Sequence, residues 1–247
     1  MSVIGELVYK ITGDPKDLKK ALATSEKGVK GFGTKLTTLS KLGIAAFGAI
    51  AIKGVAVLSK ELITVASNAE ETRNKFNVVF ADVADQARLS AQVIADSYGL
   101  SQTASEKYLS GVGDIVTGLG ATSTEALEVA DTITKLGIDI DSFANLTGGA
   151  EQAVSALTSL FTGEREAAKA LGIVINDTNL KQYAEDTGKV FNELSPLEKG
   201  FLSLELATNQ SQLAIGDFAR SQDSFANQTK ITKSNIEDLK TALGRGS

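Results

Sequence analysis

The stretch TSTEALEVADTITKLG, residues 122–137, shows the pattern that decides the fold of this chain. Thr122 and Glu125 have the spacing of a capping box, in which two side chains satisfy backbone N–H groups at the start of a helix. Ala126, Leu127 and Glu128, which are good helix formers, follow, and glycine-containing breaks separate the segment from its neighbours. The stretch therefore predicts one helix with defined ends.

Similar segments lie on both sides of this helix. Ser101 and Thr103 precede a helical segment, and Thr103 with Glu106 fits a second capping box. Gly148 and Gly149 lead into AEQAVSALTSLF, residues 150–161. The clearest start is Ser195-Pro196-Leu197-Glu198, with a Ser N-cap and Pro at the first helical position. The chain has only two prolines, so we predict an all-α fold of elongated helices and helical hairpins.

The first 41 residues differ from the rest. The segment VIGELVYKIT, residues 3–12, alternates in a way that allows a short N-terminal strand, and a Lys-rich helix follows it. We expect four parts: a strand and Lys-rich helical arm (1–41), an apolar helix (42–66), a helical-hairpin core domain (67–195) and a long exit helix (196–247).

Residues 42–58 form an apolar run, LGIAAFGAIAIKGVAVL, broken only by Lys53. A bilayer span needs about 20 apolar residues, so this run of seventeen with an internal charge is marginal as a permanent span. Two uses remain open: burial against copies of itself and neighbours, or entry into a membrane. The residues expected to make the membrane or bundle contact are Leu42, Ile44, Phe47, Ile50, Ile52, Val55, Val57 and Leu58.

Charge is distributed unevenly along the chain. Residues 1–60 hold ten lysines and four acidic residues, whereas the whole chain has a net charge of −5. A Lys-rich arm beside an apolar helix can touch an acidic lipid surface, or it can serve only to keep an exposed helix soluble. Aromatic residues are few and do not alternate with basic ones, so a specific nucleic-acid ligand is not expected.

The chain contains no Cys and no His. This excludes disulfides, Cys/His zinc sites, Cys nucleophiles and Ser-His-Asp triads, and we predict no enzymatic activity, no metal and no cofactor. Asp139-Ile140-Asp141 resembles the start of a calcium loop, but the sixth position is Ala144 and no Glu stands at the twelfth. We expect Asp141 or Ser142 to cap the next turn instead.

The exit segment carries a heptad pattern with few apolar residues. Phe218, Phe225 and Leu239 share one heptad position, Ile236 and Leu243 share the other, and the intervening sites hold Gln222, Thr229 and Thr232. So polar a seam makes a poor coiled coil by itself. The pattern is typical of a helix that needs neighbours.

Four segments, in order, resemble the amino-terminal core region of phage tail tape measure proteins, of prophage or siphophage type. They are KFNVVFADVADQARLSAQVIADSYGLS (75–101), GDIVTGLGATSTEALEVADTITKLGIDIDSFAN (113–145), ALTSLFTGEREAAKALGIVIN (156–176) and GDFARSQDSFANQTKITKSNIEDLKTALG (216–244). The strand, Lys-rich helix and apolar run that precede them also suit this family. The resemblance covers nearly the whole chain and carries over no catalytic residue.

The resemblance implies a structural virion protein. Such proteins are expected to self-associate as a helical bundle in the tail tube lumen and to set tail length during assembly in the bacterial cytoplasm. The implied partners are the tail tube protein, tail assembly chaperones and distal tail proteins. The protein would leave ahead of the genome, and its apolar segment would aid passage through the host inner membrane.

Two other functions stay open at this point. One is a holin- or toxin-like membrane-active helical protein that inserts through residues 42–66, and the other is a carboxylate-based muralytic enzyme. Fully helical, 247 residues reach about 370 Å at 1.5 Å per residue, much less than many tape measure proteins need. We therefore expect a short tape, a truncated prophage gene or a fragment.

Overall fold

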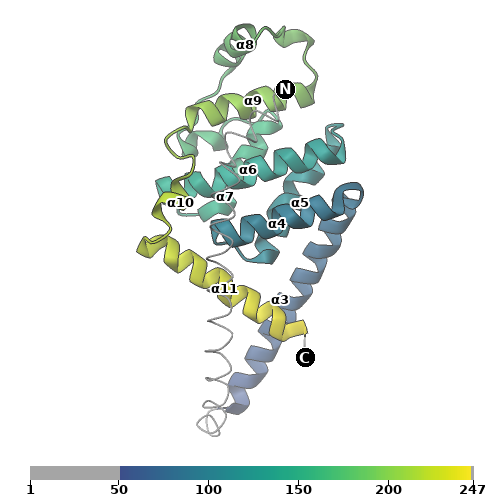
Figure 1. Cartoon of the computed structure of the whole chain (residues 1–247), viewed down its shortest axis with the longest axis vertical. Helices are drawn as coiled ribbons and strands as arrows, with labels where there is room; N and C mark the ends of the chain where they lie inside the picture. The colour runs from purple at the N-terminus through teal and green to yellow at the C-terminus, as the bar shows by residue number, and fades with distance from the viewer. Residues whose placement is uncertain (1–50, 246–247) are drawn as a thin grey trace.

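The computed structural model describes the backbone of residues 51–245 and the side chains of residues 63–244 (Figure 1). Within this range the chain is helical and contains no strand, which confirms the all-α prediction for the part described. The expected N-terminal strand, the Lys-rich helix and residues 42–50 lie outside the described range.

The described helices are α3 (Ala51–Val79), α4 (Ala84–Tyr98), α5 (Gln102–Gly118), α6 (Ser123–Ala144), α7 (Gly149–Phe161), α8 (Asp177–Asp186), α9 (Pro196–Gln210), α10 (Asp217–Ser221) and α11 (Phe225–Arg245), with short 3₁₀ turns η1 (Ala81–Val83), η2 (Ala167–Leu171) and η3 (Phe191–Glu193).

Among the helices that the structure describes, α3 is the longest, and Figure 1 shows that it runs at a slant to the others. It passes residues 66 and 67 without a break, so the expected boundary between an apolar helix and a core domain falls inside one helix. Phe76 and Phe80 at its end are buried and pack edge to face, with ring centroids 5.2 Å apart. The turn η1 then redirects the chain into α4, which ends at Tyr98 with Gly99 in the left-handed conformation.

Helix α6 lies at the centre of the helical body. Almost every residue from Ala126 to Asp141 is buried, because α5 and α7 cover it on two sides and α4 and α10 also contact it. Figure 1 shows α9, α6, α4 and α11 stacked roughly crosswise to the long axis of the molecule. The apolar core therefore follows α6 and spreads from it toward α4 and α9.

Three helix starts show how well the caps could be predicted. The capping box Thr122/Glu125 is present, and Ser195 is the N-cap of α9 with Pro196 at its first position, which confirms these two predictions. Glu198 also completes a capping box with Ser195. The box predicted for Thr103 and Glu106 is wrong. Ser101 is the N-cap of α5 and accepts the N–H of Ala104, while Glu106 is buried and pairs with Arg73.

The expected long exit helix over residues 196–247 is also wrong. The chain forms α9, a turn, the short helix α10 and then α11. The break centres on Gly216, which has φ +75°, a conformation that glycine adopts without the strain other residues would bear. We call α10 and α11, residues 217–245, the C-terminal arm. In Figure 1 the arm descends from α9 and crosses α3, with which α11 is in contact.

Candidate functional site

A line of polar residues runs along the central helix. Asp131, Lys135, Asp139 and Ser142 are spaced by four, four and three residues, so they lie on one face of α6. The first three are buried and Ser142 is half-buried. We call these four residues the polar stripe. Because a buried charge is costly unless it is paired, each member must find a partner.

The first two members of the polar stripe pair with each other. The Nζ of Lys135 lies 2.7 Å from Oδ2 of Asp131, and both side chains are buried. The hydroxyl of Ser90 on α4 donates a hydrogen bond to the other oxygen of Asp131. This end of the stripe therefore holds α4 against α6.

The other end of the stripe holds the C-terminal arm. The Asp139 carboxylate accepts the backbone N–H of Gly216 at 2.7 Å and that of Phe218 at 3.1 Å, and so caps the start of α10. Burial raises the pKa of Asp139 to about 6, although these two N–H groups act to lower it. A carboxylate on the central helix thus fixes the turn at which the arm begins.

The neighbours of Asp139 extend this contact onto α11. The Ser142 hydroxyl donates to Asp217 at 2.8 Å, and the side-chain amide of Asn227 donates to Ser142 at 2.9 Å. The Nζ of Lys230 lies 2.8 Å from Oδ2 of Asp141, whose side chain is buried. The prediction that Asp141 or Ser142 caps the next turn is therefore wrong, because both side chains point to the arm.

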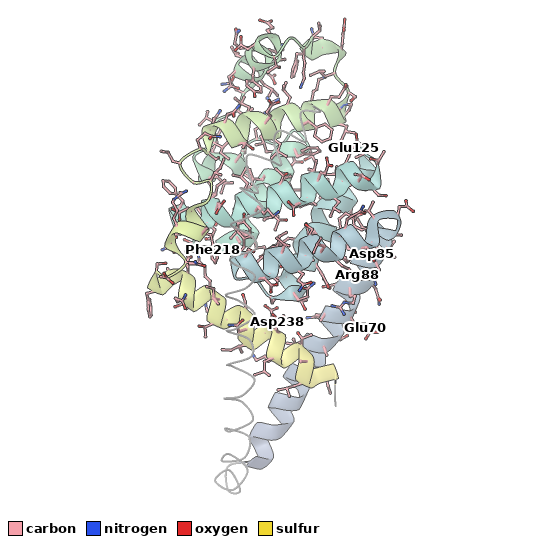
Figure 2. All side chains as sticks on the ribbon, viewed as in Figure 1. Glu70, Asp85, Arg88, Glu125, Phe218 and Asp238 are labelled. Carbon is pink, nitrogen blue, oxygen red and sulfur yellow. The ribbon has the colours of Figure 1, made fainter. Side chains whose placement is uncertain are left out.

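A second polar contact lies farther along α11, at the start of α5. The Ser101 hydroxyl donates to Glu237 at 3.0 Å, and the backbone N–H of Gln102 donates to Asp238 at 3.0 Å. Burial raises the pKa of Asp238 to about 6, and the nearby charges of Glu237 and Glu106 act in the same direction. Figure 2 shows Phe218 on α10 and Asp238 farther along α11.

One apolar contact lies between the two polar ones. The rings of Tyr98 and Phe218 are stacked with centroids 6.0 Å apart. A Cβ added at Gly99 would lie 2.6 Å from Ile231 and 2.8 Å from Phe218, so glycine alone fits beneath the arm. Burial, followed by the charges of Asp139 and Asp131, raises the pKa of Tyr98, which keeps its hydroxyl neutral.

A half-open cleft of about 460 Å³ lies between α3, α4 and α5. Its lining is polar and mixed in charge, with Arg73, Arg88, Asp96 and Glu106 among the residues. Arg73 is already paired with Glu106 at 2.9 Å, and Arg88 with Asp85 at 3.0 Å. Within residues 63–244 no cluster of acidic side chains has the geometry to hold a metal ion.

The predicted contact residues lie at the edge of the described chain. Leu42, Ile44, Phe47 and Ile50 fall outside it, and Ile52, Val55, Val57 and Leu58 lie in the first turns of α3. Among the helices that the structure describes, none combines the length and apolar character required to cross a bilayer. The proposed contact through the eight residues thus stays a prediction.

Sequence reasoning missed the polar stripe and its contact with the arm. A signal was present: Asp131, Lys135 and Asp139 recur on one face of a helix that is otherwise mostly apolar. Charges in such a helix must be buried with partners, but the spacing does not show which residues are the partners.

Comparison with protein-family models, with characterised proteins and with solved structures finds no match for this chain.

Proposed function

We propose that this chain is a structural virion protein, a phage tail tape measure protein that sets tail length during assembly and leaves the tail ahead of the genome. It would lie in the tail tube lumen as a bundle of copies. Its partners would be the tail tube protein, assembly chaperones and distal tail proteins. The proposed role is structural and not catalytic.

The arrangement of α3 supports this proposal most directly. This helix begins within the apolar run at Ala51 and continues to Val79 in the helical body. Figure 1 shows that it extends well past its crossing with α11. The end of the run thus lies on a long helix at one end of the molecule, an arrangement that would suit an elongated assembly of helices. The resemblance of four segments, in order, to tape measure proteins is the reason for proposing this family.

The direct test is tail length in the parent phage or prophage. Residues 149–194, which include α7 and α8, would be deleted in frame in one strain and duplicated in another. We expect shorter tails from the deletion and longer tails from the duplication, by up to about 1.5 Å per residue. Tails of unchanged length that contain the variant protein, or normal tails that lack the protein, would contradict the proposal.

A second candidate is a membrane-active helical protein, holin- or toxin-like, that inserts through residues 42–66. The apolar run at 42–58 favours it, and a tape protein can also use this run at the host inner membrane after ejection. Flotation with liposomes and a leakage assay, with and without residues 42–58, test membrane binding. Leakage by a chain that is absent from purified tails would favour this candidate over the first.

A further inference from the structure

Helix α11 faces the helical body mainly with polar residues, together with Ile231, and turns several large apolar residues to solvent. Asn227 and Thr241, at the centre of its inner face, are buried. On the outer face Phe225 is 89% exposed, Leu243 54% and Ile236 47%. A helix that served only to cover the core would have the opposite pattern. The outer face of α11 is therefore an exposed, partly apolar surface that another helix could cover.

The outer residues follow a heptad repeat. Thr229, Ile236 and Leu243 occupy position a, and Phe225, Thr232 and Leu239 occupy position d. Position f, opposite this seam, holds Asn227, Ser234 and Thr241, which face the body. We call the six a and d residues the outer seam; five of them are exposed and Leu239 is half-buried. Ile236 at a with Leu239 at d is the combination that favours two parallel strands, and it occurs once in the seam.

The two threonines of the outer seam present methyl groups and not free hydroxyls. The hydroxyl of Thr229 donates to the carbonyl of Phe225 at 2.8 Å, and that of Thr232 donates to the carbonyl of Gln228 at 2.8 Å. Both bonds lie within the helix itself. Burying these side chains against another helix would therefore leave no donor unsatisfied.

We propose that the outer seam pairs with the same seam of a second copy of this chain, as a parallel, in-register two-helix coiled coil. The inference rests on the self-association in the proposed function. It adds which helix mediates the association and that the two helices run parallel. In this pairing each threonine meets a threonine, and Ile236, Leu239 and Leu243 each meet their own equivalent. The seam is thus complementary to itself.

Charge decides the direction. Lys233 and Lys240 occupy position e, next to the seam, and Gln228, Asn235 and Ala242 occupy position g. In a parallel pair each e residue faces a g residue of the other helix, so Lys233 faces Gln228 and Lys240 faces Asn235. An antiparallel pair would place Lys233 opposite Lys233 of the second copy, and like charges at that position repel.

The body of each copy prepares α11 for this pairing. A free helix of 21 residues would lose much conformational entropy on association. Here α11 is already held by the ion pair of Lys230 with Asp141 and by the bond of Gln102 to Asp238. Pre-ordering of this kind lowers the cost of binding. The two bodies would lie on opposite sides of the pair, since each covers positions b, c and f of its own α11, which point away from the seam.

The absence of cysteine from the chain allows a direct test by crosslinking. Thr232→Cys places one thiol on the seam, and Gln182→Cys places one on α8, away from the arm. Under mild oxidation of the full chain we expect a disulfide-linked dimer from Thr232→Cys and about tenfold less from Gln182→Cys. Equal, low yields from the two variants would overturn the proposal. Preferential crosslinking in a mixture of Thr229→Cys and Leu239→Cys, without any from Thr232→Cys, would show antiparallel pairing and overturn it as well.

Sedimentation equilibrium supplies the second measurement. Ile236→Asn with Leu243→Asn should weaken dimerisation about tenfold or more, while circular dichroism shows the helix content retained. Unchanged dimerisation would overturn the proposal, as would a wild-type chain that stays monomeric. The crosslinking and sedimentation results are independent of the measurement of tail length. A chain that sets tail length but does not crosslink at Thr232→Cys refutes only this pairing, and a chain that crosslinks but is absent from tails refutes only the proposed function.

Discussion

The Asp139 carboxylate accepts the backbone N–H of Gly216 at 2.7 Å, and by this contact the central helix determines where the C-terminal arm begins. The turn at Gly216 separates the arm from α9, and polar residues on α6 and α5 then hold α11 along its inner face. The outer face of α11 remains exposed as a result. Asp139 and the polar contacts along α11 thus together leave this face of the arm exposed.

Replacing this carboxylate should loosen the arm. In Asp139→Asn one of the two backbone N–H groups of the turn would face an NH₂ group, so the variant should lose about 1–3 kcal/mol of unfolding free energy. Urea unfolding measures the loss, and hydrogen exchange should show faster exchange in α11 than in α7. The matched control is Asp186→Asn, an exposed carboxylate on α8, which should change stability by less than about 0.5 kcal/mol. Equal effects of the two substitutions would argue against the role assigned to Asp139.

The raised pKa values predict how stability depends on pH. Asp139 and Asp238 have pKa values of about 6 in the folded protein, above the ordinary value of a carboxyl group. At a pH between the ordinary carboxyl pKa and about 6, the folded chain binds more protons than the unfolded chain. The free energy of unfolding should therefore rise as pH falls from 7.5 to 5. This gain in the free energy of unfolding should be lost again as pH rises through about 6. The chain has no histidine to add its own titration in this range.

Urea unfolding at several pH values checks this dependence. Asp238→Asn should reduce the slope between pH 5 and 7.5, because one of the two titrating groups is gone. A free energy of unfolding that is constant or increases with pH over this range would contradict the assignment.

Gly99 offers a test of the packing beneath the arm. Gly99→Ala meets Ile231 and Phe218 in addition to the strain of φ +63°, and should cost about 2–4 kcal/mol. Gly172→Ala has a similar φ of +77° with no atom near the added Cβ, and should cost only the strain, about 1–2 kcal/mol. Thermal unfolding compares the two, and Ile231→Ala should partly rescue the first. A Gly99→Ala variant as stable as Gly172→Ala would show that the arm does not press on this turn.

The buried pair on α6 should tolerate loss of both partners better than loss of one. Lys135→Met leaves the Asp131 carboxylate buried without its cation and should cost about 3–5 kcal/mol. Adding Asp131→Leu removes the uncompensated charge and should recover most of the loss. Denaturant unfolding of the two single variants and the double variant measures the coupling, and additive effects would contradict it.

Local signals in the sequence predicted several helix starts and ends, and they failed where distant residues decide. The capping boxes at Thr122 and Ser195, and the helix end at Gly99, depend on neighbours within a few residues and were predictable. Ser101, and not Thr103, is the cap of α5, and Glu106, the expected partner of Thr103, instead binds Arg73 from another helix. The break at Gly216 depends on Asp139, which lies 77 residues away in the sequence.

The polar stripe illustrates the same limit for the candidate site. Its spacing on one helical face was visible, and the rule that buried charges need partners could have flagged it. Its partners could not be predicted, because the backbone N–H groups of Gly216 and Phe218 have no signature in the side-chain pattern. The heptad seam of α11 was visible as well, but only the fold shows that its inner side is occupied and its outer side exposed.

Tail length in the parent phage or prophage is the measurement that tests the proposed function most directly. Electron microscopy of tails from strains that carry the deletion and the duplication of residues 149–194, with the protein detected in the purified tails, gives the answer. The account predicts that length decreases with the deletion and increases with the duplication. Tails of wild-type length in both strains, with the variant proteins present, would contradict it.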